Sequence, residues 1–420
     1  MPHYAPAMSA PDDSSLLAPP AEPVARIWVA GLTLATVGMF AAFFGPMQVL
    51  LAEHAEQVAP SNKELVFGVV TGVGAAVAAL ANPLFGALSD RTASRFGRRV
   101  PWVAGGAAGV VAGLVVLVGA GAVIPLVVGW CLVQAAGNAV LAAISAAVPD
   151  RAPDWQRGAV GGWMALGQTI GALTGVGLAY LTGGYRAGYL ACAVVAALLV
   201  VPYLLRSDDR ALAPGTRPSF ELRSFLRGFW IDPRRHPDFG WAWATRFLVQ
   251  LSNSIGTLYL FFYLSDEVRY DDPERGVLVL LVVYSVFVVL TSVTSGWWSD
   301  KVRRRKAFVT WAGVVMSSAG VLLAVWPSWT GAIVAAAVLG VGFGAFLAVD
   351  FAILTEVLPN PADYGKDLGV INIANTLSQV LAPAIAAPML WLGGYRTLYA
   401  VAAAIGLAGA FAVRWIGSVP

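Results

Sequence analysis

Two ionisable residues lie inside apolar runs of this sequence. Asp350 lies nine residues before Pro359 in the run 330–358, and Arg246 lies a few residues inside the run 240–264. At a rise of about 1.5 Å per residue, both side chains would lie roughly 10–14 Å from the same end of their helices. A charge is costly in hydrocarbon and needs a partner. We therefore expect a buried ion pair, which either joins two helices or binds and releases a proton.

Amide and hydroxyl side chains recur at helical spacing along several other apolar runs. A single polar face on a membrane helix points into the bundle or into a water-filled cavity. These residues are candidates for hydrogen bonding to a solute, although bonds between helices would explain any one of them equally well. They are Asn372, Asn375 and Gln379 in 368–391; Gln134 and Asn138 in 124–148; Gln168 in 158–182; and Gln250, Asn253, Ser254 and Thr257 in 240–264, with Phe40, Phe43, Phe44 and Tyr284 as aromatic walls.

Glu53 and His54 follow the first apolar run directly. Histidine titrates near neutral pH, so a role in proton movement is conceivable. A helix end exposed to water is the more ordinary explanation, and we expect that one.

The sequence has no pattern typical of an enzyme. It contains no nucleophile elbow, no cluster of metal ligands and no nucleotide-binding loop, so we expect neither catalysis nor a cofactor nor a metal. Cys131 and Cys192 lie in apolar runs without C-x-x-C spacing and are expected to be small core residues. The net charge of +3 comes from arginines in short loops, which is not a nucleic-acid-binding pattern.

The composition requires a membrane to position these residues. Hydrophobic residues make up 58% of the chain and charged residues only 12%, against about 25% in soluble proteins. A spanning helix needs about 20 apolar residues. Twelve such spans are expected at 27–52, 64–88, 100–120, 124–148, 158–182, 186–205, 240–264, 275–298, 306–326, 330–358, 368–391 and 394–415.

The basic residues predict how these spans are oriented. With both termini inside the cell, 21 Lys and Arg residues lie in cytoplasmic segments, 5 lie outside, and Arg246 lies within a span. Short cytoplasmic loops carry an excess of Lys and Arg, so this orientation is the expected one. We expect a multi-pass protein of a bacterial cytoplasmic membrane with both termini in the cytoplasm.

The loop between the second and third spans carries a specific motif. Gly86-x-x-x-Asp90-Arg91, followed by Gly97-Arg98-Arg99, resembles the signature of the major facilitator superfamily at this position. The longer stretch Asn82–Trp102 resembles the branch that holds glycoside–cation symporters and sucrose carriers. In the superfamily, the acid that matches Asp90 stabilises the outward-open state. The resemblance therefore implies a conformational latch made of Gly86, Asp90, Arg91, Arg95, Gly97, Arg98 and Arg99, with Asp300 in the second half.

An internal repeat divides the chain into halves. Residues 296–301 (GWWSDK) echo residues 86–91 (GALSDR), and each stretch follows the second span of its half. The expected organisation is a disordered cytoplasmic tail (1–24), a six-helix half (25–205), a cytoplasmic linker (206–238) and a second six-helix half (239–420). This all-α membrane architecture of twelve helices is what the resemblance implies, with a substrate site between the halves. Gly167, Gly171 and Gly175 have the spacing of a close helix contact.

Two departures limit the resemblance. Melibiose-type sodium symporters carry two acids on the second helix, where this chain has Ala78 and Asn82, so sodium coupling by that route is not expected. Drug–proton antiporters carry Gly-Pro-x-x-Gly-Gly in the fifth helix, where this chain has no proline.

The expected function is secondary active transport of a small organic solute by alternating access. Proton-coupled symport of a sugar-like solute by a monomer is the first hypothesis. Proton-driven export of a small metabolite or antibiotic is the alternative, and a non-transporting membrane receptor or scaffold is an alternative of another class. Substrate-dependent flux would favour the two transport hypotheses, and its absence would favour the receptor or scaffold.

Overall fold

The computed structural model describes residues 22–207, 209, 235–302, 305–357 and 364–417. The regular structure in this part of the chain is helical. The first half contains α1 (Arg26–Gly45), a π-helical turn (Pro46–Leu50), α2 (Leu51–Val58), α3 (Lys63–Ser89), α4 (Val100–Val118), α5 (Val123–Arg151), α6 (Asp154–Thr182) and α7 (Tyr185–Arg206). The second half contains α9 (Pro237–Leu258), α10 (Leu260–Phe262), a π-helical turn (Tyr263–Glu267), α11 (Pro273–Val302), α12 (Arg305–Val325), α13 (Trp329–Val357) and α14 (Tyr364–Ala412).

The helices provide twelve membrane spans. Ten helical segments in the described residues are long and apolar enough to cross a bilayer, and α9 with the bent segment Leu260–Glu267 makes an eleventh. The twelfth comes from α14, whose backbone is non-helical at Gly393 and Gly394, where φ of Gly394 is +66°. A glycine adopts this left-handed conformation at little cost. The expected fold of two six-helix halves is confirmed. The predicted tail and linker lie mostly outside the described residues.

The first spans of the two halves share an irregularity. Both contain a π-helical turn in their second part, at Pro46–Leu50 and at Tyr263–Glu267. Pro46 has no backbone N–H, so the regular hydrogen-bond ladder cannot continue through it. π-helical turns are frequent at functional sites because they redirect the side chains that follow.

Small residues allow the helices of the first half to pack closely. A Cβ atom added to Gly175 of α6 would lie 2.4 Å from the carbonyl oxygen of Ala41 in α1. One added to Gly171 would lie 2.5 Å from the carbonyl oxygen of Val37. The predicted Gly167-Gly171-Gly175 face therefore forms the contact between α6 and α1.

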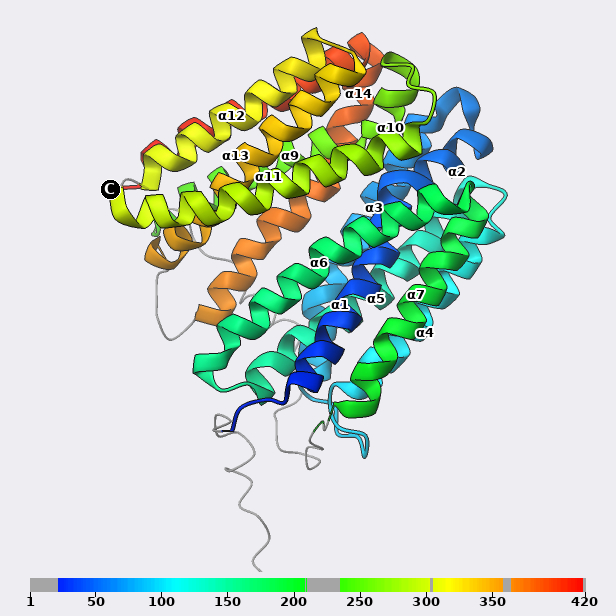
Figure 1. Ribbon diagram of the computed structural model, residues 1–420, viewed down its shortest axis with the longest axis vertical. Helices are drawn as coiled ribbons and strands as arrows, with labels where there is room; N and C mark the ends of the chain where they lie inside the picture. Colours follow the sequence, from blue (N-terminus) through cyan, green and yellow to red (C-terminus); the bar gives the residue numbers. More distant parts are fainter. Residues whose placement is uncertain (1–21, 208, 210–234, 303–304, 358–363, 418–420) are drawn as a thin grey trace, which may run out of the picture.

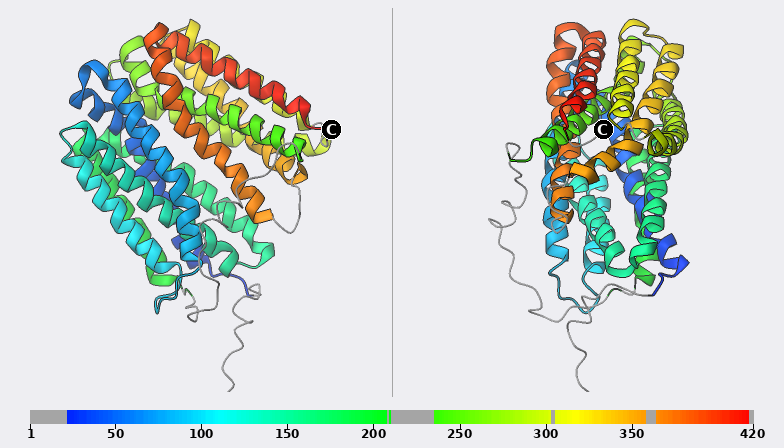
Figure 2. Two further views of the ribbon diagram at one scale, coloured as in Figure 1. Left: turned by 180° about the vertical axis from the view of Figure 1, so that it is seen from behind. Right: turned by 90° about the vertical axis from the view of Figure 1, so that its left-hand side faces the viewer.

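The two halves meet at one end and separate toward the other. We call the end of the molecule with residues 90–99 the basic end. α2 and α10 lie side by side at the opposite end, whereas loop 90–99 and the C-terminal end of α14 lie far apart (Figures 1 and 2). The interface between the halves is thus closed at the opposite end.

Candidate functional site: a cavity between the halves

A cavity of about 450 Å³ lies between the two halves. Its size is within the range of small-molecule sites. Side chains of α1, α3, α5 and α6 line it from the first half, and side chains of α9, α11, α13 and α14 line it from the second. A solute in this position would contact both halves at once.

Most of the predicted polar residues line this cavity. Gln134, Gln168, Gln250, Asn253, Ser254, Thr257, Asn375 and Gln379 belong to its wall, as do the aromatic residues Phe40, Phe44 and Tyr284. The structure does not describe the side chain of Asn372.

Two of the predicted side chains lie elsewhere. The side-chain oxygen of Asn138 accepts a hydrogen bond from Asn82 at 3.2 Å, and its amide donates to the carbonyl of Gln134 at 2.9 Å. Asn138 thus joins α5 to α3. Phe43 is buried and packs on Gly137, where an added Cβ would lie 2.4 Å from its ring. Periodicity alone could not separate residues that face the cavity from residues that face a neighbouring helix.

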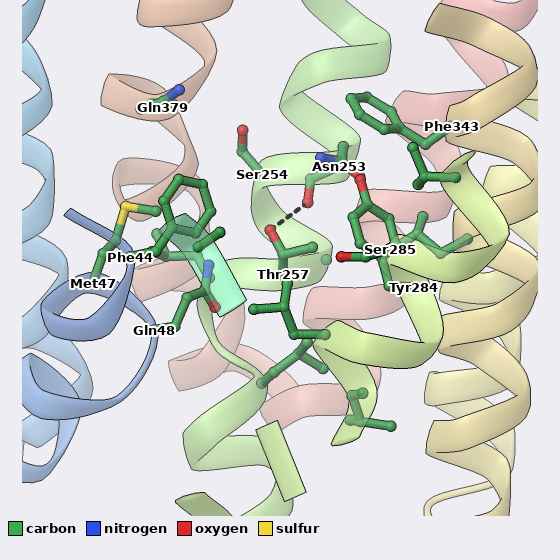
Figure 3. A pocket seen from close by; sticks show the side chains of 18 of the residues that line it. Phe44, Met47, Gln48, Asn253, Ser254, Thr257, Tyr284, Ser285, Phe343 and Gln379 are labelled. Atoms are coloured by element: carbon green, nitrogen blue, oxygen red, sulfur yellow. Dashed lines mark hydrogen bonds between the residues drawn. The ribbon is translucent and has the colours of Figure 1, made fainter. Parts of the chain in front are cut away.

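The sequence interpretation missed several residues of the wall. Met47 and Gln48 come from the π-helical turn, and Thr71, Trp130 and Ser285 also line the cavity. Figure 3 shows Phe44, Met47 and Gln48 on one side, facing Asn253, Ser254, Thr257 and Tyr284 on the other. Pro46 is the one sequence signal that could have indicated this turn.

The wall of the cavity contains amides, hydroxyls, aromatic rings and aliphatic side chains. None of the described residues that line it is Asp, Glu, Lys, Arg or His. On the second half, the hydroxyl of Tyr284 donates to the side-chain oxygen of Asn253 at 3.4 Å. Such a wall can donate hydrogen bonds to a solute and accept them from it. It has no charged side chain that could neutralise a charge on the solute.

The buried Asp350 and the half-buried Arg246 lie together directly behind this wall. Arg246 of α9 donates from Nη1 to Oδ2 of Asp350 in α13, and from Nε to Oδ1 of Asn375 in α14 at 3.0 Å. Gln250 donates from Nε2 to the same Asn375 oxygen at 3.1 Å. Asp350 is buried, with 6% of its surface exposed. The cluster joins three helices of the second half.

A polar clasp joins the halves at the opposite end. Lys63 at the start of α3 donates to Asp266 in the second half at 2.7 Å and to Glu56 in its own half at 2.9 Å. Tyr395 donates to Asp266 at 3.0 Å and to Glu64 at 3.4 Å. These bonds close the cavity on this side.

Aromatic rings support this clasp. Phe67 packs edge-on against Tyr259 and Phe262 of the second half, with ring centroids 5.5 and 5.4 Å apart. The two halves therefore share an apolar contact next to the polar one.

At the basic end, Arg99 connects the residues of the predicted latch. Its guanidinium donates to Asp90 at 2.5 Å, to Ser89 at 2.5 Å and to Asp150 at 2.9 Å, and Arg98 also pairs with Asp150. Burial would lower the pKa of Arg99, but the charges of Asp150 and Asp90 outweigh it and raise that pKa above its usual value. All of these partners belong to the first half.

The other predicted latch residues lie around this network. Arg91 donates to the carbonyl of Ala87 at 2.9 Å, and the guanidinium of Arg95 lies over the ring of Phe96. Gly86 accepts a backbone bond from Asp90. The side chain of Asp300 lies outside the described part of the structure.

Asp209 is a latch contact that the sequence interpretation missed. Its carboxylate accepts the backbone N–H groups of Arg99 at 2.5 Å and Val100 at 2.9 Å. An acid is favoured at a helix N-terminus, here that of α4. Gly97 has a φ of +92°, and a Cβ there would lie 2.3 Å from Asp209. The glycine of the motif thus makes room for an acid of the linker.

The expectation of a water-exposed helix end at Glu53 and His54 is wrong for His54. The His54 ring is fully buried, bonds the carbonyl of Ala120 at 2.7 Å through Nε2 and stacks on Tyr185 with centroids 4.1 Å apart. One carboxylate oxygen of Glu53 is also buried and has no hydrogen-bond partner among the described residues. The helix continues to Val58, so both residues lie before its end.

Comparison with known proteins identifies the class to which this fold and cavity belong. The family model of the Major Facilitator Superfamily matches residues 27–283 and 273–420. The chain belongs to this family of multi-pass membrane transporters. The branch of glycoside–cation symporters and sucrose carriers finds no support here. A search of curated proteins returns no match.

Several solved transporters share the fold. The chain is similar to a peptide transporter of the POT family in complex with sulfate, with 13% identity and a TM-score of 0.74 over 96% of this chain and 98% of that one. It is also similar to the nucleoside transporter NupG, with 13% identity and a TM-score of 0.72 over 93% and 100%. A third is a POT family transporter in complex with 5-aminolevulinic acid, with 12% identity and a TM-score of 0.74 over 91% and 94%.

Proposed function

We propose that this transporter moves a small, uncharged, hydroxyl-rich solute of the sugar class together with a proton. The observation that carries the proposal is the cavity wall, which combines six amide side chains of the predicted set with aromatic rings and no charged residue. Burying a charged solute there would leave its charge without a partner, which is costly. A sugar presents hydroxyls to the amides and apolar ring faces to Phe40, Phe44 and Tyr284.

The transport cycle we propose is alternating access. The halves meet at the clasp and separate toward the basic end. By the positive-inside rule, the arginine-rich basic end faces the cytoplasm of a bacterial cell, so this conformation is inward-open. The opposite conformation would break the clasp and bring the basic ends of the two halves together. We propose a monomer as the working unit.

Asp350 is the proton site in this proposal. It is the buried acid behind the cavity wall, and its partner Arg246 also donates to a neighbouring amide. Intramembrane acids with such partners are typical of proton relays. The Asp90–Arg99 network is the latch at the basic end, available to the second half when the basic ends meet.

Flux into proteoliposomes under an imposed pH gradient tests the proposal. Labelled neutral mono- and disaccharides are compared with uronates, which differ from them by one carboxylate. We expect a neutral sugar to accumulate with inward protons, and its uronate to move at least about tenfold more slowly because its charge is not matched. Asp350→Asn should abolish accumulation but permit downhill exchange. Equal transport of sugar and uronate, or gradient-driven uptake by Asp350→Asn, would contradict it.

Asp90→Asn tests the latch in the same liposomes. This variant should fold but transport more slowly in both directions. A wild-type transport rate would show that Asp90 has no role in the transport cycle.

Export of an amphiphilic metabolite or antibiotic is the second candidate. The feature that favours it is the wall contributed by α11, where Val277, Leu280, Leu281 and Val288 face the cavity. Proton-driven movement of an amphiphile out of the same liposomes, without sugar flux, would establish this function instead.

A further inference from the structure

The amide of Asn375 lies between the cavity and the buried ion pair. Its Oδ1 accepts two hydrogen bonds, from Gln250 Nε2 at 3.1 Å and from Arg246 Nε at 3.0 Å. Gln250 and Asn375 line the cavity, whereas Arg246 and Asp350 do not. Asn375 is therefore the one residue of this cluster that contacts both the cavity and Arg246.

The hydrogen-bond capacity of these amides is only partly used. Among the described residues, none bonds to the side-chain NH₂ of Asn375 or to the side-chain oxygen of Gln250. An amide has two donor hydrogens and an acceptor oxygen, so both residues can still bind a hydroxyl. A solute hydroxyl that donates to Asn375 Oδ1 would compete with Gln250 and Arg246 for that oxygen.

Arg246 divides its donors between two acceptors. Nη1 bonds Asp350, and Nε bonds Asn375, so the planar guanidinium is held in one orientation by two fixed contacts. Arg246 is the charged side chain that acts on Asp350 in the described part of the protein. Loss of the Nε contact would free the guanidinium to turn away and would leave the carboxylate without its counter-charge.

We propose that Asn375 is a positioning residue that transmits solute binding to the proton site. This inference rests on the proposed proton symport. In the empty carrier, Asn375 holds Arg246 against Asp350 and keeps the carboxylate ionised. A sugar hydroxyl bonded to Asn375 releases Arg246, and Asp350 then takes a proton from water. Coupling between two sites is reciprocal, so protonation of Asp350 must favour solute binding to the same degree. Symport requires this positive coupling.

Infrared titration of the purified full-length protein in lipid films tests the role of Asn375 without any solute. The protonated carboxyl band that disappears in Asp350→Asn reports on Asp350. Asn375→Ala should raise the proton affinity of Asp350 by about tenfold, because a hydrogen bond to a charged group is lost. Asn375→Ser is a second variant, which keeps a polar side chain at this position. Its hydroxyl is too short to reach both Gln250 Nε2 and Arg246 Nε, so the Asp350 midpoint should again rise. A midpoint equal to wild type in both variants would overturn the proposal.

Asn253→Ala is the matched control. Asn253 is also a cavity amide on α9, but its side chain bonds Tyr284 and not the ion pair. Its substitution should leave the Asp350 midpoint unchanged. An equal shift in Asn253→Ala and Asn375→Ala would show a general effect of cavity amides and would contradict the assignment.

Sucrose, a neutral and hydroxyl-rich probe, tests the solute step. It should raise the Asp350 midpoint in wild type but not in Asn375→Ala. Equal shifts in wild type and Asn375→Ala would overturn the proposal. If sucrose shifts no variant, the proposed sugar class is contradicted, and the solute-free comparison still decides the role of Asn375. Absence of any Asp350 titration would contradict proton symport itself.

Discussion

Lys63 forms one hydrogen bond within its own half and one across to the other half. Its ammonium group lies 2.9 Å from Glu56 and 2.7 Å from Asp266, so two similar ion pairs differ in whether they join the halves. This arrangement provides a test of alternating access in which the variant and its control share the same lysine.

We predict that Asp266→Asn shifts the equilibrium away from the conformation described here, whereas Glu56→Gln does not. A partly exposed ion pair contributes about 0.5–1 kcal/mol, which corresponds to roughly a two- to fivefold change in population. Spin labels at the exposed positions Ser61 and Asp271 would report the separation of the halves at this end.

The measurement requires a background in which Cys131 and Cys192 are replaced. Longer label distances in Asp266→Asn than in Glu56→Gln are the expected result. Identical distance distributions in the two variants would show that the clasp does not control the conformation.

We predict that Arg99→Ala strongly destabilises the first half. Arg99 is buried and pairs with both Asp90 and Asp150, so its removal takes the guanidinium from Asp90 and leaves Asp150 paired with Arg98 alone. Breaking a buried pair in this way costs about 3–5 kcal/mol, and the partial exposure of the two acids places the expected loss at the lower end. The Tm of the detergent-solubilised protein measures it.

Arg95→Ala is the control for this prediction. Arg95 belongs to the same loop, but the contact shown for its guanidinium is with the ring of Phe96. A melting temperature close to wild type is expected. A similar loss in both variants would mean that the loop responds to total charge and not to the Arg99 network.

We predict that Gly175→Ala destabilises the contact between α1 and α6, while Gly177→Ala does not. A Cβ at Gly175 would lie 2.4 Å from the carbonyl oxygen of Ala41, whereas one at Gly177 meets nothing within 4 Å. Overpacking costs about 1–3 kcal/mol. Alanine is the better helix former by about 1 kcal/mol, so Gly177→Ala should be neutral or stabilising. Equal melting temperatures of the two variants would contradict the close contact.

We predict that His54→Gln lowers stability without moving the pH midpoint of transport. His54 is buried between Ala120 and Tyr185, away from the cavity wall, and glutamine can still donate to the Ala120 carbonyl. Glutamine cannot reproduce the ring stack on Tyr185, and an aromatic pair of this kind contributes about 0.5–1.5 kcal/mol. Uptake measured across a series of pH values would show an unchanged midpoint, and a displaced midpoint would assign His54 to the proton path.

The membrane spans could be predicted because each consists of a long apolar run between charged or glycine-rich turns. The cavity amides could be predicted in part because a polar stripe on an apolar helix must face either water or another polar group. Asn138 satisfies the same rule by bonding Asn82, and the sequence carries no information that separates the two cases.

Other features depend on contacts that the sequence does not show. Gln48 enters the cavity because Pro46 changes the helical register. Asp209 reaches the N-terminus of α4 from 109 residues away along the chain, which is a tertiary contact without a local pattern. His54 is buried because α2 continues past the apolar run and packs beneath Tyr185.

The uncharged wall of the cavity has an electrical consequence. If the solute is neutral and the only ion carried is a proton, each cycle moves one net positive charge across the bilayer. The membrane potential then contributes about 2.3 kcal/mol per 100 mV. At 1.4 kcal/mol for each factor of ten, a voltage of that size alone would support roughly 40-fold accumulation of the solute.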